Sequence, residues 1–375
     1  MTRSAILVLN AGSSSLKYQL LGPEGQTYTS GLIERIGEPG GEPDHAAALR
    51  RVLSGLPQDV QMEAVGHRVV HGGERFTQAT RITPEVLATI DELSDLAPLH
   101  NPPAVQGIRA ALGGLPGVPN VAVFDTAFHT TLPPQAYLYA VPHDLYRNFG
   151  VRRYGFHGTS HAYVSRRAAE LLGGPQSPEA QKIVTLHLGN GASAAAVLRG
   201  QSVDTSMGLT PLEGLVMGTR SGDLDPGAVL WLTEKFGLEE TTRLLNRQSG
   251  LKGLSGVSND LRDVRAAQSE RAELALAVMT YRLIKQVGAY AAAMNGLGAL
   301  VFTGGAGEND AKLRADVLQG LTFLGFELDE AANGQRSGER RITTAESKPA
   351  LVIPTDEEGE IARQTRQVLT ADRAG

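Results

Sequence analysis

Two arginines stand in stretches of small and apolar residues, where a positive charge is unusual. Arg68 lies in "GHRVVHGGE", which otherwise has the composition of a strand, and Arg220 lies in "MGTRSGDLDP". A buried guanidinium without a partner costs free energy, so each arginine needs an anion. The anion could be a structural carboxylate, but arginines among small residues also suit bidentate binding of phosphate or carboxylate. Both interpretations stay open at this point.

Histidines gather in the first half of the sequence. Eight of the nine fall between His67 and His187, within polar segments such as "FDTAFH" and "YGFHGTSH". Two pairs have i, i+4 spacing, which raises the alternative of a zinc site. The zinc-protease pattern needs a helix and an internal Glu, whereas "HRVVH" has no Glu and is predicted to be a strand. We therefore do not expect zinc.

Two glycine-containing turns have the same layout. "ILVLNAGSSSLKYQLL" (residues 6–21) and "IVTLHLGNGASAAAVL" (residues 183–198) each run strand, turn, strand, and Asn10 aligns with His187 as Gly12 aligns with Gly189. Small residues leave the backbone N–H groups of such turns open, and consecutive N–H groups make an anion site. The repeat predicts two hairpins, one from each half of the chain, that hold a polyphosphate.

A third glycine-rich segment, "ALVFTGGAGEND" (residues 299–310), predicts a strand, a glycine loop and then a helix from "AKLRADVLQGL". A helix N-terminus favours the phosphate of a nucleotide. Neither the G-x-G-x-x-G spacing of dinucleotide-binding folds nor the Walker pattern occurs.

Three acidic residues in "LVIPTDEEGEIARQ" follow a buried strand and begin a predicted helix: Asp356, Glu357 and Glu358. Acidic side chains at a helix N-terminus are favourable in themselves. We favour a second interpretation, a magnesium ligand, because a carboxylate at a strand end beside phosphate-binding loops would help to hold the metal.

The elements that must position these residues alternate between strands and helices, which predicts an α/β fold with mixed sheets. Asp225, Pro226 and Gly237 mark the start and end of one helix. The region 22–55, rich in Gly, Pro and Glu, is expected to be peripheral loop and hairpin. The predicted strands are 6–10, 65–70, 121–124, 183–188, 299–303 and 350–353.

Composition limits the function classes. With 375 residues, of which 41% are hydrophobic and 20% charged, two domains are more probable than one. A net charge of −5 provides no overall electrostatic attraction to nucleic acid. The lack of cysteine excludes thiol chemistry. The most apolar stretch, 274–287, contains Arg282 and Lys285, so no membrane span is predicted. We expect a cytoplasmic protein.

Ten motifs, in order over residues 6 to about 360, together resemble those of the acetate kinase family. They are "LNAGSSSLKYQL", "GHRVVHGGE", "LAPLHNPP", "FDTAFH", "YGFHGTSH", "HLGNG", "MGTRSGDLDP", "SNDLRD", "FTGGAGEN" and "IPTDEE".

The resemblance implies an α/β fold of two related actin-like (ribonuclease H-like) domains with mixed sheets, which hold nucleotide and substrate in the cleft between them. Residues 1–128 and 356–375 would form the first domain, completed by the C-terminal helix. Residues 129–355 would form the second, with most nucleotide contacts. The implied reaction is reversible transfer of the ATP γ-phosphoryl group to acetate by a homodimer, with Mg²⁺, or alternatively Mn²⁺, as the cofactor and ATP or ADP as a substrate.

The family's functional residues map onto this chain as follows. The catalytic residues would be Asn10, Arg68, Asp125, His157 and Arg220. Acetate would contact Arg68, Val70, Leu99, Phe156 and Pro211. The nucleotide would contact Ser13, Ser15, Lys17, His187, Asn190, Gly191, Asp260, Arg262, Gly305, Ala306, Gly307 and Asn309. The metal would be held by Asn10 and Glu357.

An ionised carboxylate acceptor needs no general base, so Asp125 is expected to organise the site rather than accept a proton. Two alternatives remain: a kinase for propionate or another short-chain carboxylate, and a nucleotide-dependent switch protein on the same fold. Two features depart from the family: the segment from Lys17 to Gly66 is short, and Ala306 replaces a larger aliphatic residue.

Overall fold

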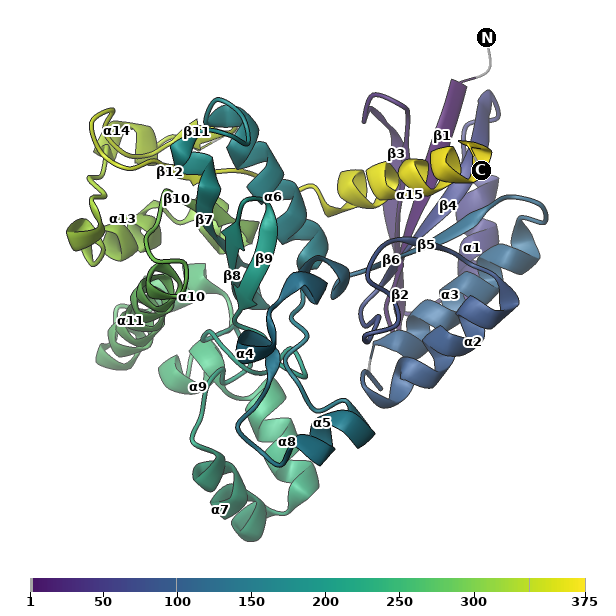
Figure 1. The fold of residues 1–375 in the computed structure, drawn as a ribbon. Helices are drawn as coiled ribbons and strands as arrows, with labels where there is room; N and C mark the ends of the chain where they lie inside the picture. Colours follow the sequence, from purple (N-terminus) through teal and green to yellow (C-terminus); the bar gives the residue numbers. More distant parts are fainter. Residues whose placement is uncertain (1–2, 99, 337, 375) are drawn as a thin grey trace. The chain divides into compact units, whose positions relative to one another are not determined.

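The computed structural model describes residues 3–98, 100–336 and 338–374 (Figure 1). The chain divides into two compact units, each built around its own sheet. Unit 1 consists of the residues up to Thr130 together with those from Asp356 onward, and unit 2 is Thr131–Thr355. The last helix of the chain, yellow in Figure 1, therefore belongs to the unit in which the chain begins. Among the described residues, no helix is both long and apolar enough to cross a membrane.

Unit 1 has a six-stranded mixed sheet in the order β3-β2-β1-β4-β6-β5. The first three strands form an antiparallel meander, β1, β4 and β6 run parallel, and β5 is antiparallel to β6. The strands are β1 (Arg3–Ala11), β2 (Ser15–Leu21), β3 (Thr27–Glu34), β4 (Val60–Val69), β5 (Thr80–Arg81) and β6 (Asn120–Phe124).

Helices cover both faces of this sheet. Successive side chains of β1 point to opposite faces, and apolar residues on each face pack against a helix. Leu7 shares a core with Leu49 of α1, whereas its neighbour Ile6 shares a core with Ile361 of α15. The helical segments are α1 (His45–Ser54), α2 (Pro84–Glu92), η1 (Leu93–Asp95), α3 (Asn101–Gly114), η2 (Ala127–Thr131) and α15 (Glu357–Ala374).

Unit 2 repeats this topology. Its sheet has the order β9-β8-β7-β10-β12-β11, with an antiparallel meander β7-β8-β9, parallel β7, β10 and β12, and β11 antiparallel to β12. The strands are β7 (Lys182–Leu188), β8 (Ala192–Leu198), β9 (Gln201–Thr205), β10 (Ala299–Thr303), β11 (Arg340–Arg341) and β12 (Ala350–Val352).

The helices of unit 2 surround its sheet and extend away from it in Figure 1. They are α4 (Pro134–Tyr137), α5 (His143–Phe149), α6 (Gly158–Leu171), η3 (Pro178–Gln181), α7 (Pro226–Phe236), α8 (Leu238–Arg247), α9 (Gly250–Ser255), α10 (Leu261–Ala266), α11 (Glu270–Ala293), α12 (Gly304–Asn309), α13 (Ala311–Gln319), η4 (Thr322–Leu324) and α14 (Glu330–Asn333).

The repeated hairpin predicted from the sequence is confirmed. Asn10, near the end of β1, pairs with Lys17 of β2, and His187, near the end of β7, pairs with Ser193 of β8. Each hairpin occupies the same place in its sheet. The six predicted strands are also present, as are the predicted helix boundaries at Asp225 and Gly237 of α7.

Two local predictions are wrong. The region 22–55 is not merely peripheral, because it holds β3 and α1, and α1 buries Leu49 and Val52 in the core of unit 1. The segment predicted as a glycine loop after β10 is the short helix α12, whose backbone hydrogen bonds outweigh the poor helix propensity of glycine.

Candidate active site

Three of the candidate catalytic residues come from the ends of neighbouring strands in unit 1. Asn10 lies near the end of β1, Arg68 near the end of β4, and Asp125 directly after β6. These strands are parallel and adjacent, so their carboxyl ends meet at one edge of the sheet. That edge is where ligands bind in α/β sheets.

Arg68 and Asp125 form a two-point ion pair. Nη2 and Nε of Arg68 donate to Oδ2 and Oδ1 of Asp125 at 2.5 and 3.2 Å, and Nη1 lies 3.4 Å from Oδ1 of Asn10. The Asp125 side chain is only 1% exposed. Burial opposes the charge of Arg68, but Asp125 and Glu357 outweigh it and raise the pKa of Arg68 above its ordinary value. Arg68 thus has a structural carboxylate partner.

Glu357, the first residue of α15, adds a second carboxylate beside the same guanidinium. Burial, and then the negative charges of Asp125 and Glu358, raise the pKa of Glu357, although Arg68 and Lys17 act in the opposite direction. Glu358 itself forms an ion pair with Lys17, with Oε1 2.5 Å from Nζ. A half-buried carboxylate whose charge is incompletely balanced suits a cation.

Magnesium fits this oxygen-rich group. Among the described residues, no three His, Cys, Asp or Glu side chains are grouped so that they could hold a metal ion by themselves. Mg²⁺, however, often takes only one or two protein ligands and completes its shell with water and substrate phosphates. The carboxylate of Glu357 and the amide oxygen of Asn10 are donors of the kind it prefers.

The turn between β1 and β2 carries Ser13, Ser15 and Lys17, which were predicted to contact the nucleotide. Gly12 N donates to Ser15 O at 2.8 Å, and a Cβ on Gly12 would lie 2.7 Å from Ser15 Oγ, so a side chain there would displace the serine hydroxyl. Ser13 and Lys17 are exposed.

In unit 2, two candidate histidines lie against each other. The rings of His157 and His187 stack with centroids 4.3 Å apart and an interplanar angle of 26°. Nδ1 of His187 lies 2.8 Å from Ser160 Oγ, which also lies 2.8 Å from Thr355 Oγ1. His157 immediately precedes α6 with a φ of 55°, a left-handed conformation that is uncommon outside glycine. Because this backbone conformation is unfavourable by itself, the contacts of His157, among them the stacking on His187, must hold the residue in place.

Arg220 differs from Arg68 because it has no carboxylate partner among the described residues. Its Nη1 donates to the carbonyl of Pro211 at 2.6 Å, and burial lowers its pKa. The two aspartates that follow it in sequence are otherwise engaged: Asp223 accepts from Gly214 N and Asp225 caps α7. The anion that Arg220 needs is therefore not supplied by a described side chain.

Arg220, His157 and Gly191 converge. A Cβ on Gly191 would lie 2.6 Å from Arg220 Nη2 and 3.5 Å from His157 Nε2. The turn between β7 and β8 thus places a backbone segment without a side chain beside Arg220 and His157. This is the arrangement expected of an anion site.

The other residues predicted to bind the nucleotide lie in two further segments of unit 2. The first segment contains Asn259, Asp260 and Arg262. Asn190 contacts it through a hydrogen bond, because its Oδ1 accepts from Asn259 Nδ2 at 3.1 Å. Asp260 pairs with Arg262 at 2.6 Å, and hydrogen bonds from Arg262 lower the pKa of Asp260 to about 2. The Arg262 side chain is 88% exposed, so its outer face is open to a ligand.

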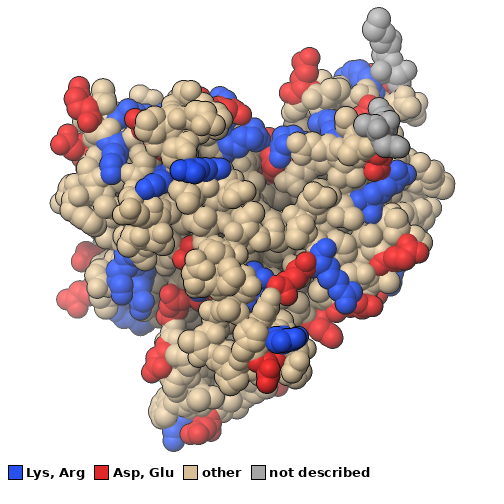
Figure 2. All heavy atoms as spheres, in the orientation of Figure 1, with Lys and Arg blue, Asp and Glu red and all other residues tan. Residues whose placement is uncertain are grey.

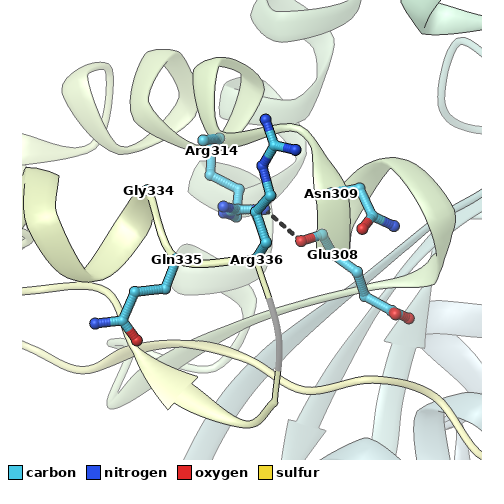
Figure 3. A pocket seen from close by; sticks show the side chains of 7 residues that line it. Glu308, Asn309, Arg314, Gly334, Gln335 and Arg336 are labelled. Atoms are coloured by element: carbon cyan, nitrogen blue, oxygen red, sulfur yellow. Dashed lines mark hydrogen bonds between the residues drawn. The ribbon is translucent and has the colours of Figure 1, made fainter.

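The second segment is α12, which contains Gly305, Ala306, Gly307 and Asn309. Arg314 of α13 is buried beneath it and donates to the carbonyls of Gly307 and Glu308 at 2.9 Å each. Burial lowers the pKa of Arg314 to about 10. A pocket of about 300 Å³ opens beside the end of α12 (Figure 3). Its lining residues are Glu308, Asn309, Ala311, Arg314, Gly334, Gln335 and Arg336.

The predicted acetate-binding residues are divided between the units. Val70 follows β4 in unit 1 and is half-buried, whereas Phe156, which is buried, and Pro211 belong to unit 2. Leu99 lies outside the described residues. Pro211 is connected to the candidate site through its carbonyl, which accepts from Arg220.

Sequence reasoning missed the hydroxyl residues that contact the histidines. Ser193 Oγ lies 2.8 Å from His157 Nδ1, and Ser160 holds His187. One signal was available for Ser193: the register of the repeated hairpin places it opposite His187. No sequence spacing indicates that Ser160 and Thr355 meet, because 195 positions separate them.

Comparison with known proteins identifies the family of this chain. The profile of the acetokinase family matches residues 5–363. The acetate kinase of Thermotoga maritima is 51% identical over 398 residues, covering 97% of this chain and 98% of that protein. The acetate kinase of Leifsonia xyli subsp. xyli is 53% identical over 397 residues, covering 98% and 100%.

Two solved structures have the same fold over nearly the whole chain. Acetate kinase from Porphyromonas gingivalis has a TM-score of 0.92 at 47% identity and covers 98% of this chain and 100% of its own. A propionate kinase from Francisella tularensis has a TM-score of 0.89 at 41% identity, with coverage of 97% and 100%. The chain belongs to the acetokinase family.

Proposed function

We propose that this chain is an acetate kinase, which transfers the γ-phosphoryl group of ATP to acetate and forms acetyl phosphate and ADP reversibly. Relatives named acetate kinase, about half identical over almost the whole length, support this function. The structural observation that carries it is Arg220, a cation without a carboxylate partner among the described residues, placed beside Gly191 and His157. A phosphoryl group is the anion that such a site would take.

In this proposal the phosphoryl group moves directly from one oxygen to another. An acetate oxygen forms a bond to the γ-phosphorus while the bond from that phosphorus to the β–γ bridging oxygen breaks, and ADP leaves with the electron pair. Negative charge spreads over the equatorial oxygens, so catalysis depends on position and positive charge. Arg220 and His157 of unit 2 would stabilise that charge.

Arg68 and Asn10 of unit 1 would serve the same reaction. Acetate and phosphate repel each other, and Arg68 would reduce that repulsion. Asp125 has both oxygens engaged by Arg68, which supports a role in orienting the arginine rather than in accepting a proton. No base is needed in any case, because acetate is already ionised at neutral pH.

We propose that Glu357 and Asn10 contribute protein oxygens to Mg²⁺, for which Mn²⁺ is a reasonable substitute. When bound, the ion would neutralise charge on the phosphates. The raised pKa of Glu357 supports this role, because a nearby cation would favour its ionised form.

The nucleotide is proposed to contact three segments of unit 2. These are the β7–β8 turn with His187, Asn190 and Gly191, the start of α10 with Asp260 and Arg262, and α12. Ser13, Ser15 and Lys17 of unit 1 would approach its phosphates. Val70, Phe156 and Pro211 are proposed to contact the acetate methyl group. We also propose that units 1 and 2 are the two domains expected from the sequence.

We further propose that the protein is a homodimer in the cytoplasm, where ATP is available. Helix α7 buries none of its side chains, and the large exposed apolar residues along it and at the start of α8 support a partner. Exposed fractions there are 68% for Leu230, 56% for Trp231, 54% for Phe236 and 73% for Leu238. A second copy of the chain would cover this surface. On the face drawn in Figure 2, basic and acidic side chains are interspersed, and we propose no nucleic-acid or membrane partner.

Trapping of acyl phosphate with hydroxylamine tests the proposed function. The protein is supplied with ATP, Mg²⁺ and, in separate reactions, acetate, propionate, butyrate or glycerol. We expect the largest hydroxamate signal with acetate, its loss in Arg68→Ala, and its retention in Arg75→Ala, an exposed arginine of the same unit. A larger signal with propionate would favour the alternative carboxylate kinase. No hydroxamate from any acid, with ATP still bound, would favour the nucleotide-dependent switch.

A further inference from the structure

A chain of hydrogen bonds runs behind His157 in unit 2. Ser193 Oγ lies 2.8 Å from His157 Nδ1 and 2.8 Å from His161 Nε2, and the other ring nitrogen of His161, Nδ1, lies 2.7 Å from Thr185 Oγ1. Ser193, His161 and Thr185 are fully buried. None of the three belongs to the residues proposed above to contact substrate or nucleotide.

The surroundings of Ser193 indicate that its hydroxyl group, rather than its size, is what this position requires. Strand β8 has the sequence ASAAAVL, and the neighbours of Ser193 on either side are fully buried alanines. An alanine would fit this strand equally well by volume. The hydroxyl nevertheless lies within hydrogen-bond distance of two histidines, His157 at the N-cap of α6 and His161 within that helix.

Ser193 has one hydroxyl hydrogen, so it donates to at most one of the two histidines, and each histidine nitrogen to which it does not donate must itself donate to Ser193 Oγ. A neutral imidazole likewise has one N–H and one bare nitrogen. The directions of all three hydrogen bonds are therefore coupled. If Ser193 donates to Nδ1 of His157, then His161 donates from Nε2 to Ser193, Thr185 donates to Nδ1 of His161, and the hydrogen of His157 is on Nε2.

An anion bound beside His157 would favour this arrangement, in which Nε2 of His157 carries the hydrogen. Nε2 of His157 lies 3.5 Å from the position a Cβ of Gly191 would take, on the same side as Arg220 Nη2. A phosphoryl oxygen there can accept a hydrogen bond from Nε2–H, but not from a bare nitrogen. The ring is also held on one face by stacking against His187.

We propose that Ser193, with His161 behind it, is a positioning residue that fixes the tautomer and orientation of His157, so that Nε2–H is directed at the transferring phosphoryl group. This inference rests on the proposed function, because it assigns the recipient of the hydrogen bond. Ser193 acts through His157 and does not itself contact the substrate.

The test begins with Ser193→Ala, which removes the hydroxyl in a strand already rich in alanine. We expect kcat for acyl phosphate formation to fall about 10- to 100-fold, by analogy with the loss of a group that orients a metal-binding histidine. The KM values for ATP and acetate should change much less. Ser165→Ala is the matched control, since Ser165 is a buried serine of α6 whose hydroxyl donates to Ala162 O. It should retain normal kcat.

A double-mutant cycle with His157→Gln separates this role from a structural one. Once His157 is replaced, adding Ser193→Ala should lower kcat no further. An equal loss of kcat in both backgrounds, or a normal kcat in Ser193→Ala alone, would overturn the inference while leaving the proposed function intact. The absence of acyl phosphate from the unaltered protein would instead overturn the proposed function.

Nitrogen-15 NMR of labelled histidine provides a readout that does not depend on activity. The His157 resonances, assigned by comparison with His157→Gln, should show the Nε2–H tautomer in the unaltered protein and a shift toward a tautomer mixture in Ser193→Ala. The Nδ1–H tautomer in the unaltered protein, or identical spectra for the two proteins, would contradict the proposed hydrogen-bond direction.

Discussion

Replacing each of the two arginines by methionine should have different consequences for stability, although both variants should lose activity. Arg220 has no carboxylate partner among the described residues, so Arg220→Met leaves no buried negative charge behind. It loses the hydrogen bond to Pro211 O, worth about 1–3 kcal/mol, but also removes the cost of burying a guanidinium. Its net effect on the free energy of unfolding should be about 1 kcal/mol or less. Arg68→Met removes the ion-pair partner of Asp125, whose side chain is 1% exposed, at a cost of about 3–5 kcal/mol.

For domains of this size, about 1 kcal/mol corresponds to a change of roughly 2–4 °C in Tm. We therefore expect Arg220→Met to unfold within about 4 °C of the unaltered protein and Arg68→Met about 6–20 °C below it, as measured by circular dichroism. The kcat of Arg220→Met should nevertheless fall about 10³- to 10⁵-fold, the effect of removing an arginine that stabilises a transferring phosphoryl group. Hydroxylamine trapping under saturating substrates measures this loss.

Arg243→Met is the control for this comparison, because Arg243 is an exposed arginine of unit 2 that pairs with Glu240. It should change neither Tm nor kcat appreciably. The reasoning would be refuted if Arg220→Met kept kcat within tenfold of the unaltered protein, or if it lowered Tm more than Arg68→Met does.

Glu357→Gln should raise the free energy of unfolding of the metal-free protein, measured in urea, more at pH 7.5 than at pH 5. The raised native pKa of Glu357 makes its ionisation cost stability as the pH rises above about 4.5, and glutamine removes that cost; equal effects at the two pH values would contradict this. His67, whose pKa is lowered from 6.5 to about 4, should contribute up to about 3 kcal/mol to the loss of stability between pH 6.5 and 4, and His67→Gln should remove that part; an unchanged acid slope would contradict it. Val70→Ala should raise kcat/KM for propionate relative to acetate by about tenfold, and no shift would remove Val70 from the substrate pocket. Trp231→Glu should convert a dimer into monomers in sedimentation experiments, whereas an unaffected dimer would exclude the surface of α7 as its interface.

The sequence predicts elements best where a short-range physical signal is strong. Buried strands such as 299–303 have continuous apolar runs, and the residues that begin and end α7, Asp225 and Gly237, are recognisable from the sequence. The repeated hairpin predicted from residues 6–21 and 183–198 also anticipates the duplicated sheet topology. These features depend on neighbours in sequence, which a reader of the sequence can see.

Features that depend on tertiary packing were missed or wrong. Helix α1 was hidden by the surrounding Gly, Pro and Glu, although Asp44 is a recognisable N-cap whose side chain accepts from Ala47 N. The arginines illustrate the same limit for the site. The sequence places aspartates next to Arg220, but in the structure they hold backbone amides, while Arg68 pairs with an aspartate 57 positions away.

Phosphorus-31 NMR of the unaltered protein with ATP, Mg²⁺ and acetate tests the central claim most directly. The account predicts that an acyl phosphate resonance and those of ADP grow together, and that both are absent when acetate is replaced by glycerol. Release of inorganic phosphate at the same rate with or without acetate, and no acyl phosphate, would contradict it.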